Sequence, residues 1–427
     1  MKIYNYSDLN TSDIVELVQR NVDPANEIRA IVEEVLDNVR QHGDSALLDY
    51  AHKFDKVELN KLYLDKEELA EIASAISDEQ KAALQIAYNN IYKFHQTQVK
   101  TEDKVETMPG VTCWRELRAI EKVGLYIPGG SAVLPSTFLM LGIPAQIAGC
   151  REIVVCSPPQ KNGKVNAFIA YVAQLLGVDK IYLAGGAQAI GAMAYGTESI
   201  VKVDKIFGPG NQFVTKAKTI IQSTTTTAID MPAGPSEVLV IADETAKPEF
   251  IAADLLAQAE HGIDSQAILV TTSAQIAEAT LAEVERQTAV LPRAEIVKQA
   301  LDNSYVVITE TLDQAMNFSN QYAPEHLILA TDNWQQLTAK IVNAGSVFLG
   351  NLTPESAGDY ASGTNHTLPT SSYARAYSGV SVDSFVKKIT FQHITPEGIN
   401  NIGPSVEILA ELESLHAHKN AVSVRMK

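Results

Sequence analysis

The chain of 427 residues is longer than one hydrophobic core usually organises, so we expect two or more domains. Charged residues make up 20% and hydrophobic residues 46% of a globular composition, and the net charge of −17 argues against a nucleic-acid partner. No apolar run is long enough to span a bilayer, and the N-terminus lacks the apolar core of a signal peptide, which favours a cytoplasmic location.

The first hundred residues have the periodicity of helices. Apolar positions between residues 28 and 39 fall on one helical face, and Gly43 is expected to end that helix. A second helix is expected to start at Ser77, because Ser77 and Gln80 have the spacing of a capping box. Its apolar side would carry Leu84, Ala87, Ile91 and Phe94.

From residue 122 onward, short apolar strands alternate with segments that can form helices. The first series is "KVGLYIP", "EIVVCSP", "KIYLAGG" and "VDKIFGPG", and the second is "EVLVIAD", "QAILVTT", "SYVVITE", "HLILAT" and "SVFLG". Continuous apolar strands separated by helices are typical of parallel sheets covered on both faces. We therefore predict an α/β fold with two doubly wound units. The tail after residue 376 shows one short helical pattern, so it must dock on this chain or on a partner subunit.

Three glycine-rich turns each follow a predicted strand. They are "YIPGGSA", "LAGGAQAIGA" and "FGPGNQF". Open α/β sheets bind ligands at such turns, and the helix N-termini that follow favour phosphate. None of the three matches the G-x-G-x-x-G fingerprint, and each alone can be a simple connection. Together they favour a nucleotide bound in an unorthodox way.

Several nitrogen and oxygen donors have spacings that suit a metal. Gln258 and His261 in "LLAQAEHG" are three residues apart on one face of an expected helix, which Pro248 would begin and Gly262 would end. Asp359 stands in the long polar stretch "ESAGDYASGTNHTLPT", which we expect to be a loop. One histidine of the tail "ELESLHAHKN" would complete a set of four ligands. A set without thiolates suits a catalytic or substrate-binding zinc better than a structural one.

The three cysteines are not expected to carry chemistry. Cys113, Cys150 and Cys156 are odd in number and lack CxxC spacing, which argues against a disulfide framework or a thiolate zinc site. A nucleophilic thiol could oxidise an aldehyde, but none of the three has a histidine nearby or a helix N-terminal setting. Buried structural thiols are the better interpretation.

The stretch "QYAPEHL" places Glu325 beside His326 at the start of a predicted strand. A base at a strand edge beside a carboxylate suits proton abstraction from an alcohol or from water, whereas a strand entry without chemistry is the alternative. Adjacent residues on an extended chain point in opposite directions, so separate roles are more natural than a shared hydrogen bond.

A series of blocks resembles the histidinol dehydrogenase family. The blocks, in chain order from about residue 112 to the end, are "VGLYIPGGSA", "GGAQAI", "GPGNQFVTKAK", "DMPAGPSEVLVIAD", "AQAEHG", "APEHL", "GDYASGTNH" and "AHKNAV". The resemblance implies a four-electron oxidation of L-histidinol to L-histidine through bound L-histidinaldehyde, with two NAD⁺ consumed, as the last step of histidine biosynthesis. No cysteine is required for this reaction.

Residue roles also follow from the resemblance. Glu325 and His326 match the acid/base residues of the family, with His326 accepting protons from the alcohol and the hydrated aldehyde and Glu325 activating the added water. The zinc ligands, one ion per subunit, match Gln258, His261, Asp359 and His418. The substrate contacts match Ser236, Gln258, His261, His326, Asp359, Glu413 and His418. The NAD contacts match Tyr126, Gln188 and Asn211.

The resemblance further implies a homodimer in which the C-terminal tail contributes Glu413 and His418 to the site of the partner. It also implies two incomplete Rossmann-like domains with small terminal extensions. We expect an N-terminal extension (1–23), a first domain (24–125 with 236–375), a second domain that carries the NAD turns (126–235) and a dimerisation tail (376–427). A zinc hydrolase that needs no nicotinamide, or an inactive binding protein, would be the competing interpretations.

Overall fold

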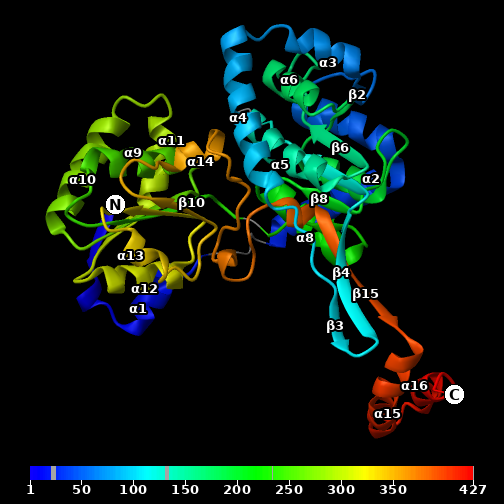
Figure 1. Cartoon of the computed structure of the whole chain (residues 1–427). Coiled ribbons are helices and arrows are strands. Elements are labelled where there is room, and N and C mark those ends of the chain that lie inside the picture. The colour runs from blue at the N-terminus through cyan, green and yellow to red at the C-terminus, as the bar shows by residue number, and fades with distance from the viewer. Residues whose placement is uncertain (21–25, 130–133, 233, 427) are drawn as a thin grey trace.

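The computed structural model describes residues 1–20, 26–129, 134–232 and 234–426. Figure 1 shows two α/β units side by side, with a hairpin that projects from one of them and carries the C-terminal helices. Two parts of the predictions lie outside the described residues, namely the expected boundary at residue 23 and residues 130–132 of the first glycine-rich turn.

One unit is built on a six-stranded parallel sheet. Across the sheet its strands are β1 (Lys2–Asn5), β12 (Tyr305–Ile308), β11 (Gln266–Thr271), β10 (Glu237–Ala242), β13 (His326–Ala330) and β14 (Ser346–Leu349). From β12 to β14 the strand order is that of a doubly wound sheet, with the direction of winding reversed between β10 and β13.

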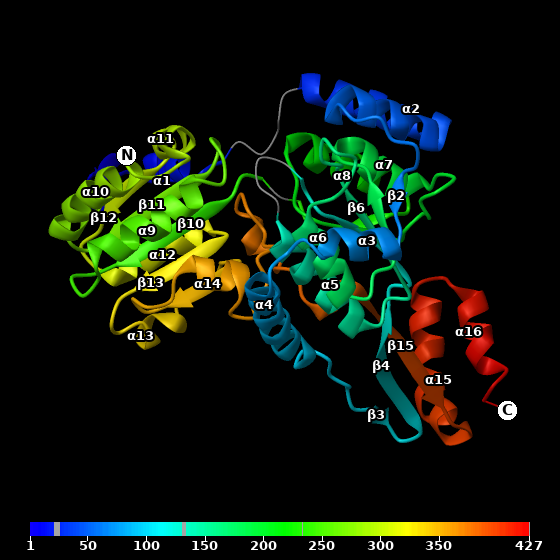
Figure 2. The ribbon, with the colours of Figure 1, turned by 90° about the horizontal axis from the view of Figure 1, so that it is seen from above.

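Helices cover both faces of this first sheet. One face packs against α1 (Thr11–Val18), α12 (Leu312–Tyr322) and α13 (Gln335–Thr338). The other packs against α9 (Pro248–Ala259), α10 (Ala274–Thr288) and α11 (Ala294–Asp302). Figure 1 shows α9, α10 and α11 above this sheet and α1, α12 and α13 below it, and Figure 2 shows the same unit from above.

The other unit contains a second six-stranded sheet with the same winding. Its strands are β2 (Tyr63–Leu64), β7 (Ile181–Leu183), β6 (Glu152–Ser157), β5 (Lys122–Tyr126), β8 (Lys205–Phe207) and β9 (Ala228–Ile229). Only β2 runs antiparallel to its neighbour. The winding reverses between β5 and β8, so the second switch point lies there.

The second sheet is also covered on both faces. One face packs against α2 (Asn26–Tyr50), α7 (Gly186–Tyr195) and α8 (Gln212–Thr224). The other packs against α3 (Lys66–Ala73), α4 (Asp78–Gln96), α5 (Pro135–Ala148) and α6 (Ala167–Leu175).

The predicted α/β class and both predicted series of strands are confirmed. The central strands form because they are continuous runs of Val, Ile and Leu, and every residue of β10 and β13 is buried. Burial of each such side chain contributes roughly 1.5–3 kcal/mol, which stabilises a strand flanked by helices on both faces. The sheets therefore provide rigid edges on which a site can be built.

The structure tests the predicted start of one helix and the predicted end of another. The capping box of Ser77 and Gln80 is confirmed at the start of α4. The prediction that Gly43 ends the first helix is confirmed, because Gly43 leaves helical geometry with φ 52° and ψ −127°, and a second helical segment of α2 follows this kink and continues to Tyr50. Phe94 is predicted on the apolar side of α4, but it lies outside the core at 45% exposure. The neighbouring His95 is buried in its place.

The packing groups residues 26–125 differently from the predicted division. The predicted division places these residues with the unit of residues 236–375, yet α2 shares a buried cluster with α7 and α8 of the second unit. Strand β5, which ends at Tyr126, lies in the middle of the second sheet. The apolar faces of α2 to α4 do not reveal which sheet they cover, so sequence periodicity could not decide this assignment.

The projecting hairpin belongs to neither six-stranded sheet. Antiparallel strands β3 (Val105–Met108), β4 (Val111–Ala119) and β15 (Val386–Ile394) form it, and β15 leads to α15 (Pro396–Leu412) and α16 (His416–Ser423). The tail thus has two helices rather than the one predicted. Leu412 is 77% exposed, so these helices leave apolar surface uncovered. None of the helices formed by the described residues has the length and apolar character needed to cross a membrane.

Candidate active site at a sheet edge

The candidate site lies where two adjacent strands of the first sheet, β10 and β13, begin. His326 is the first residue of β13 and pairs with Val238 of β10, which begins at Glu237. The chain reaches this edge from α12 through Ala323, whose φ of 55° is left-handed and turns the backbone toward the strand. Glu325 and His326 are both buried, and both lie at the switch point of the first sheet.

The contacts of His326 assign a role to each ring nitrogen. Nδ1 lies 3.2 Å from the carbonyl oxygen of Glu237. Because a carbonyl can only accept, Nδ1 carries a proton in either charge state of the ring, and Nε2 holds the lone pair when the ring is neutral. Nε2 is buried 3.5 Å from Oδ1 of Asp359, and no hydrogen-bond partner is found for it among the described residues. Nε2 is therefore the atom that can accept a proton from a bound molecule.

Glu325 is held separately from His326. Its Oε2 accepts a hydrogen bond of 2.9 Å from the backbone N–H of Glu237 and lies 3.7 Å from Nδ1 of His326. The longer distance is not a hydrogen bond, which agrees with separate roles for the two residues. Burial raises the pKa of Glu325 to about 8, against the opposing effect of His326. A carboxyl group with a raised pKa is a stronger base once ionised.

Glu355 is a site residue that the sequence reasoning missed. The stretch expected to be a loop forms the short helix α14 (Glu355–Tyr360), and Glu355 and Asp359 lie one turn apart on it. Oε1 of Glu355 is 3.7 Å from Nδ1 of His326, and burial raises the pKa of Glu355 to about 8. Burial alone lowers the pKa of His326, but Glu355, Glu325 and Asp359 outweigh it and raise that pKa to about 10.

A group of donors beside His326 fits a divalent cation. One ligand atom from each of His261, Glu355 and Asp359 lies within 4.8 Å of the others. Gln258 is fully buried, and neither its side-chain oxygen nor its nitrogen has a partner among the described residues. An amide buried without partners is costly, so its oxygen is expected to serve a bound ion or ligand. The donor set of oxygen and imidazole nitrogen is one that zinc accepts.

The local geometry around Gln258 differs from the predicted helix. Helix α9 begins at Pro248 as predicted but ends at Ala259, so His261 lies in the following turn. The backbone N–H of His261 still donates to the carbonyl of Gln258, at 3.2 Å, which keeps the two residues together. Asp254 lies one turn earlier, accepts a hydrogen bond from the backbone of Glu355, and has its pKa raised to about 7 by burial.

The remaining predicted substrate residues divide into two groups. Ser236 directly precedes Glu237 at the same sheet edge. Glu413 and His418, by contrast, are exposed, Glu413 as the C-cap of α15 and His418 on α16, and Figure 1 shows these helices at the far end of the hairpin from α9 and α14. A single chain therefore does not bring the predicted tail residues to the other ligands. His416 lies on the same exposed helix.

The three predicted cofactor residues converge at the carboxyl-terminal edge of the second sheet. Tyr126 ends β5, and its hydroxyl accepts a hydrogen bond of 3.1 Å from the backbone of Gly186 at the start of α7. Gln188 is buried in the first turn of that helix. Asn211 is the N-cap of α8 and accepts hydrogen bonds from the next turn. These turns lie where doubly wound sheets bind nucleotides.

A buried ion pair fixes the turn that precedes Asn211. Lys218 and Asp230 form the pair, and Nζ of Lys218 also donates to the carbonyl of Gly208 at 2.9 Å. Oδ2 of Asp230 accepts from the backbone N–H of Gly208 at 2.9 Å. Gly208 has φ 130°, and a Cβ there would lie 2.2 Å from the carbonyl oxygen of Tyr126. The turn is therefore rigid and requires glycine.

Two connections hold the second sheet's carboxyl edge close to the first sheet's amino edge. Strand β9 ends at Ile229 and β10 begins at Glu237, so one short segment joins the two edges. His366 bridges them again, since Nδ1 contacts the carbonyl of Asp359 at 2.8 Å and Nε2 contacts Oγ1 of Thr137 in α5 at 3.0 Å. These contacts connect the α5 side of the second unit to the α14 segment that carries Asp359.

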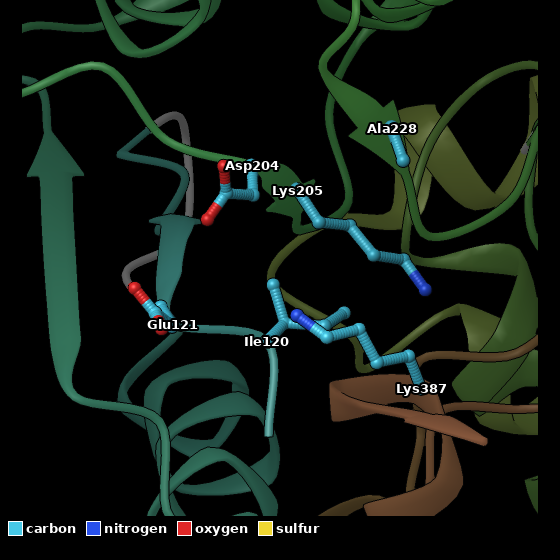
Figure 3. Close-up of a pocket in the computed structure, with 6 residues that line it drawn as sticks. All are labelled: Ile120, Glu121, Asp204, Lys205, Ala228 and Lys387. Atoms are coloured by element: carbon cyan, nitrogen blue, oxygen red, sulfur yellow. The ribbon is translucent and has the colours of Figure 1, made fainter. Parts of the chain in front are cut away.

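A cavity of about 470 Å³ elsewhere on the second unit is separate from this site. Figure 3 shows the side chains that line it: Ile120, Glu121, Asp204, Lys205, Ala228 and Lys387. Several of these residues lie where strands of the second sheet begin, which is the edge opposite the cofactor turns. The cavity therefore does not contribute to the chemistry described above.

The cysteines agree with the interpretation of inert thiols. All three are free, and Cys156 is fully buried in β6. Burial raises the pKa of Cys150 to about 11 and that of Cys156 to about 12, so both stay protonated near neutral pH.

Comparisons with known proteins point to one family. The family model described as histidinol dehydrogenase matches residues 18–426. A histidinol dehydrogenase from Bacteroides thetaiotaomicron is 55% identical over 100% of this chain and 99% of its own. The histidine biosynthesis trifunctional protein of Saccharomyces cerevisiae is 53% identical over 97% of this chain and 52% of its own. The crystal structure of histidinol dehydrogenase from Elizabethkingia anophelis matches with a TM-score of 0.96 and 56% identity, covering 100% of this chain and 98% of its own.

Proposed function

Because the chain belongs to the histidinol dehydrogenase family, we propose that it oxidises L-histidinol to L-histidine through L-histidinaldehyde, the last step of histidine biosynthesis. The observation that carries the proposal is a set of buried polar atoms without hydrogen-bond partners among the described residues, namely Nε2 of His326, beside Asp359, and the side-chain amide of Gln258. A base beside buried polar groups at one sheet edge suits an alcohol that must be held and deprotonated.

His326 and Glu325 divide the proton transfers. Nε2 of His326 accepts the hydroxyl proton in the oxidation of the alcohol and later a hydroxyl proton of the aldehyde hydrate. Glu325, at the same edge, removes a proton from the water that adds to the aldehyde. Bound NAD⁺ supplies the hydride acceptor for each oxidation, and we assign its contacts to Tyr126, Gln188 and Asn211.

We assign the zinc ligands to Gln258, His261 and Asp359, with His418 of the partner subunit as the fourth. When bound, the ion supplies a grip on the imidazole and amine of the substrate, which orients the alcohol and retains the aldehyde. Support comes from the clustering of His261 and Asp359 beside Gln258. The same proposal places Ser236 and the partner subunit's Glu413 against the substrate.

The test of the overall reaction is an NAD-dependent assay with histidinol. We expect two NADH per histidine formed, loss of activity after chelation and recovery after zinc is added back. Turnover of a substrate without NAD would indicate the zinc hydrolase instead. Absence of any oxidation by the zinc-loaded protein would overturn the proposal.

The division of proton transfers has its own test. His326→Ala should abolish both half-reactions, whereas Glu325→Gln should chiefly slow oxidation of the aldehyde, by roughly 10²–10⁴-fold, because only that half-reaction consumes the water that Glu325 activates. The two half-reactions are measured separately, starting from histidinol or from histidinaldehyde. Equal losses in both assays for Glu325→Gln would contradict the division.

A further inference from the structure

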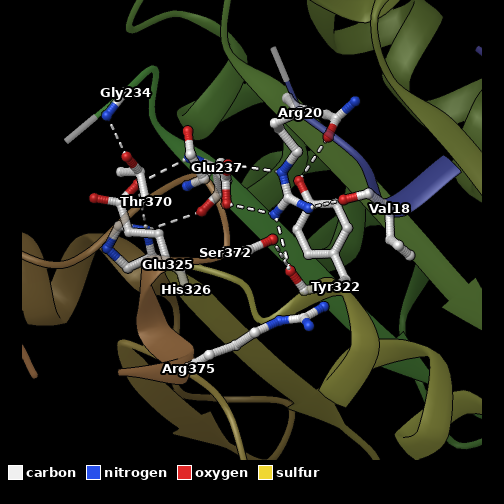
Figure 4. Close-up of polar contacts among 12 residues, drawn as sticks. Val18, Arg20, Gly234, Glu237, Tyr322, Glu325, His326, Thr370, Ser372 and Arg375 are labelled. Atoms are coloured by element: carbon white, nitrogen blue, oxygen red, sulfur yellow. Dashed lines mark hydrogen bonds and ion pairs between the residues drawn. The ribbon is translucent and has the colours of Figure 1, made fainter. Parts of the chain in front are cut away.

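Arg20 enters the candidate site from the N-terminal segment, directly after α1. Its side chain is only 11% exposed and forms a two-pronged ion pair with Glu237 at the start of β10. Nε lies 2.9 Å from Oε1 of Glu237, and Nη2 lies 2.8 Å from Oε2. Figure 4 shows this pair next to Glu325 and His326. Such a planar pairing fixes the carboxylate in direction as well as in position.

Arg20 also holds the turn that leads to Glu325 and His326. Its guanidinium carbon lies 3.3 Å from the centre of the Tyr322 ring, and Nη2 donates to the carbonyl oxygen of Tyr322 at 3.1 Å. The next residue, Ala323, has the left-handed φ of 55°, which an alanine adopts only when its surroundings impose it. Arg20 thus stabilises the backbone immediately before the Pro324–His326 segment.

Glu237 connects this anchor to both proposed acid/base residues. Its backbone N–H donates to Oε2 of Glu325, and its carbonyl oxygen accepts from Nδ1 of His326. Its side chain is fixed from the other direction, because Oε1 accepts a hydrogen bond of 2.8 Å from the backbone N–H of Ser371 as well as the one from Arg20. Movement of Glu237 would therefore displace Glu325 and His326 together.

The charge of Glu237 needs a partner at this depth. The side chain of Glu237 is 2% exposed, and the carboxyl group of Glu325 accepts a hydrogen bond from the backbone N–H of Glu237. A buried carboxylate without a counter-charge is strongly disfavoured, so loss of Arg20 would displace the side chain of Glu237.

From these contacts we propose that the Arg20–Glu237 ion pair is a positioning element that sets the orientation of Glu325 and His326 for the proposed reaction. Neither side chain needs to touch the substrate. The inference rests on the proposed function, since it assigns a purpose to contacts around residues that this function uses.

The first experiment compares Arg20→Met with a matched control. We expect kcat to fall about 10- to 100-fold in both half-reactions, while KM for histidinol and for NAD changes little, because misplacement by about 1 Å can cost that much. Zinc content should stay unchanged. Arg29→Met removes an exposed arginine that pairs with Glu33 at 2.8 Å on α2, and should leave kcat as in the wild type. An unchanged kcat in folded Arg20→Met would overturn the inference.

The second experiment asks whether Arg20 acts through Glu325. In the Glu325→Gln background, Arg20→Met should reduce oxidation of histidinaldehyde less than in the wild type, since its effect through Glu325 is then lost and only its effect through His326 remains. The same fold-loss in both backgrounds would indicate a merely structural role and would overturn the inference.

Arg20→Lys provides the variant that keeps the charge and the fold. A lysine offers a point charge without the two-pronged geometry, so we expect a kcat between those of the wild type and Arg20→Met. A wild-type kcat in Arg20→Lys would contradict the positioning role of the ion-pair geometry. Absence of histidinol oxidation by the wild-type protein would instead overturn the proposed function, which keeps the two failures distinguishable.

Discussion

At the scale of single residues, Gly208 tests how closely the cofactor turn must approach β5. Gly208→Ala adds a Cβ that would lie 2.2 Å from the carbonyl of Tyr126, at a residue with φ 130°. We expect a loss of about 1–3 kcal/mol in the free energy of unfolding and a higher KM for NAD. Urea unfolding and initial rates measure the two effects.

Gly149→Ala is the matched control for this substitution. Gly149 also has a positive φ, of 82°, but a Cβ there would meet nothing within 4 Å. Gly149→Ala should therefore lower the free energy of unfolding only by the cost of the backbone conformation and leave KM for NAD unchanged. Equal effects of the two substitutions would contradict the collision with Tyr126.

Asp55 gives a pH-dependent prediction away from the metal ligands. Burial raises the pKa of Asp55 to about 6, above its ordinary value, so the folded state binds the proton more tightly than the unfolded state does. The resulting stabilisation is complete below about pH 4 and is lost as the pH rises through about 6. Asp55→Asn should therefore be stabilising at pH 7 and neutral at pH 4, as measured by urea unfolding at each pH. A constant difference across this range would contradict the shift.

At the scale of elements, the ion pair of Lys218 and Asp230 is predicted to hold the start of α8 against β9. Lys218→Met leaves Asp230 buried without its counter-charge, so the free energy of unfolding should fall by about 3–5 kcal/mol. KM for NAD should rise as well, since the Gly208 turn loses one of its anchors. Urea unfolding and NAD titration measure the two changes.

The matched control removes an exposed lysine from a helix. Lys298 pairs with Glu295 at 2.8 Å on α11, and both side chains are largely exposed. Lys298→Met should cost less than about 1 kcal/mol, because exposed pairs contribute little. A small effect of Lys218→Met would show that the turn is held by other contacts.

Individual elements also show what the sequence could and could not reveal. The strands and the Glu325–His326 pair were predictable because local patterns of apolar residues, Pro324 and titratable groups carry them. Helix α14 was not predicted, since Gly358 and the polar composition around it lower helix propensity, and Glu355 was missed with it. The spacing of four residues between Glu355 and Asp359 was the signal in the sequence that could have identified Glu355.

Arg20 could not be found from local sequence at all. Its partner Glu237 is 217 residues away, and no periodicity links a residue after a short N-terminal helix to the first residue of a central strand. The same limit applies to residues 26–125, whose helical pattern is clear but whose sheet is chosen by long-range packing. Local patterns thus predict elements better than they predict which elements meet.

At the scale of the whole molecule, the proposed site combines the carboxyl-terminal edge of the second sheet with the amino-terminal edge of the first sheet. The cofactor turns follow the general rule that doubly wound sheets bind ligands at the carboxyl ends of their strands. Glu237 and His326, in contrast, begin their strands at the amino end of the other sheet. The short connection from β9 to β10 makes this arrangement possible, because the chain enters the next sheet directly instead of crossing back.

The position of the tail leads to a prediction about subunits. Gln258, His261 and Asp359 lie on one unit, and His418 lies on the distant α16, so the proposed ligand set closes only if another chain supplies the tail. His418→Asn should then lower the zinc content, as measured by elemental analysis, and His416→Asn should not. The reverse result would assign the ligand to His416.

A mixing experiment tests whether the tail acts between subunits. His326→Ala removes the base but keeps an intact tail, and His418→Asn removes the tail ligand but keeps an intact base, so each variant alone should be nearly inactive. If the chain forms the proposed dimer, a mixed dimer made by unfolding and refolding the two variants together would contain one site with both groups intact. Recovery of about one quarter of wild-type activity is expected, since half of randomly formed dimers are mixed and each has one working site of two. If His418 served the site of its own chain, no mixed dimer could combine the intact groups, and the mixture would stay inactive.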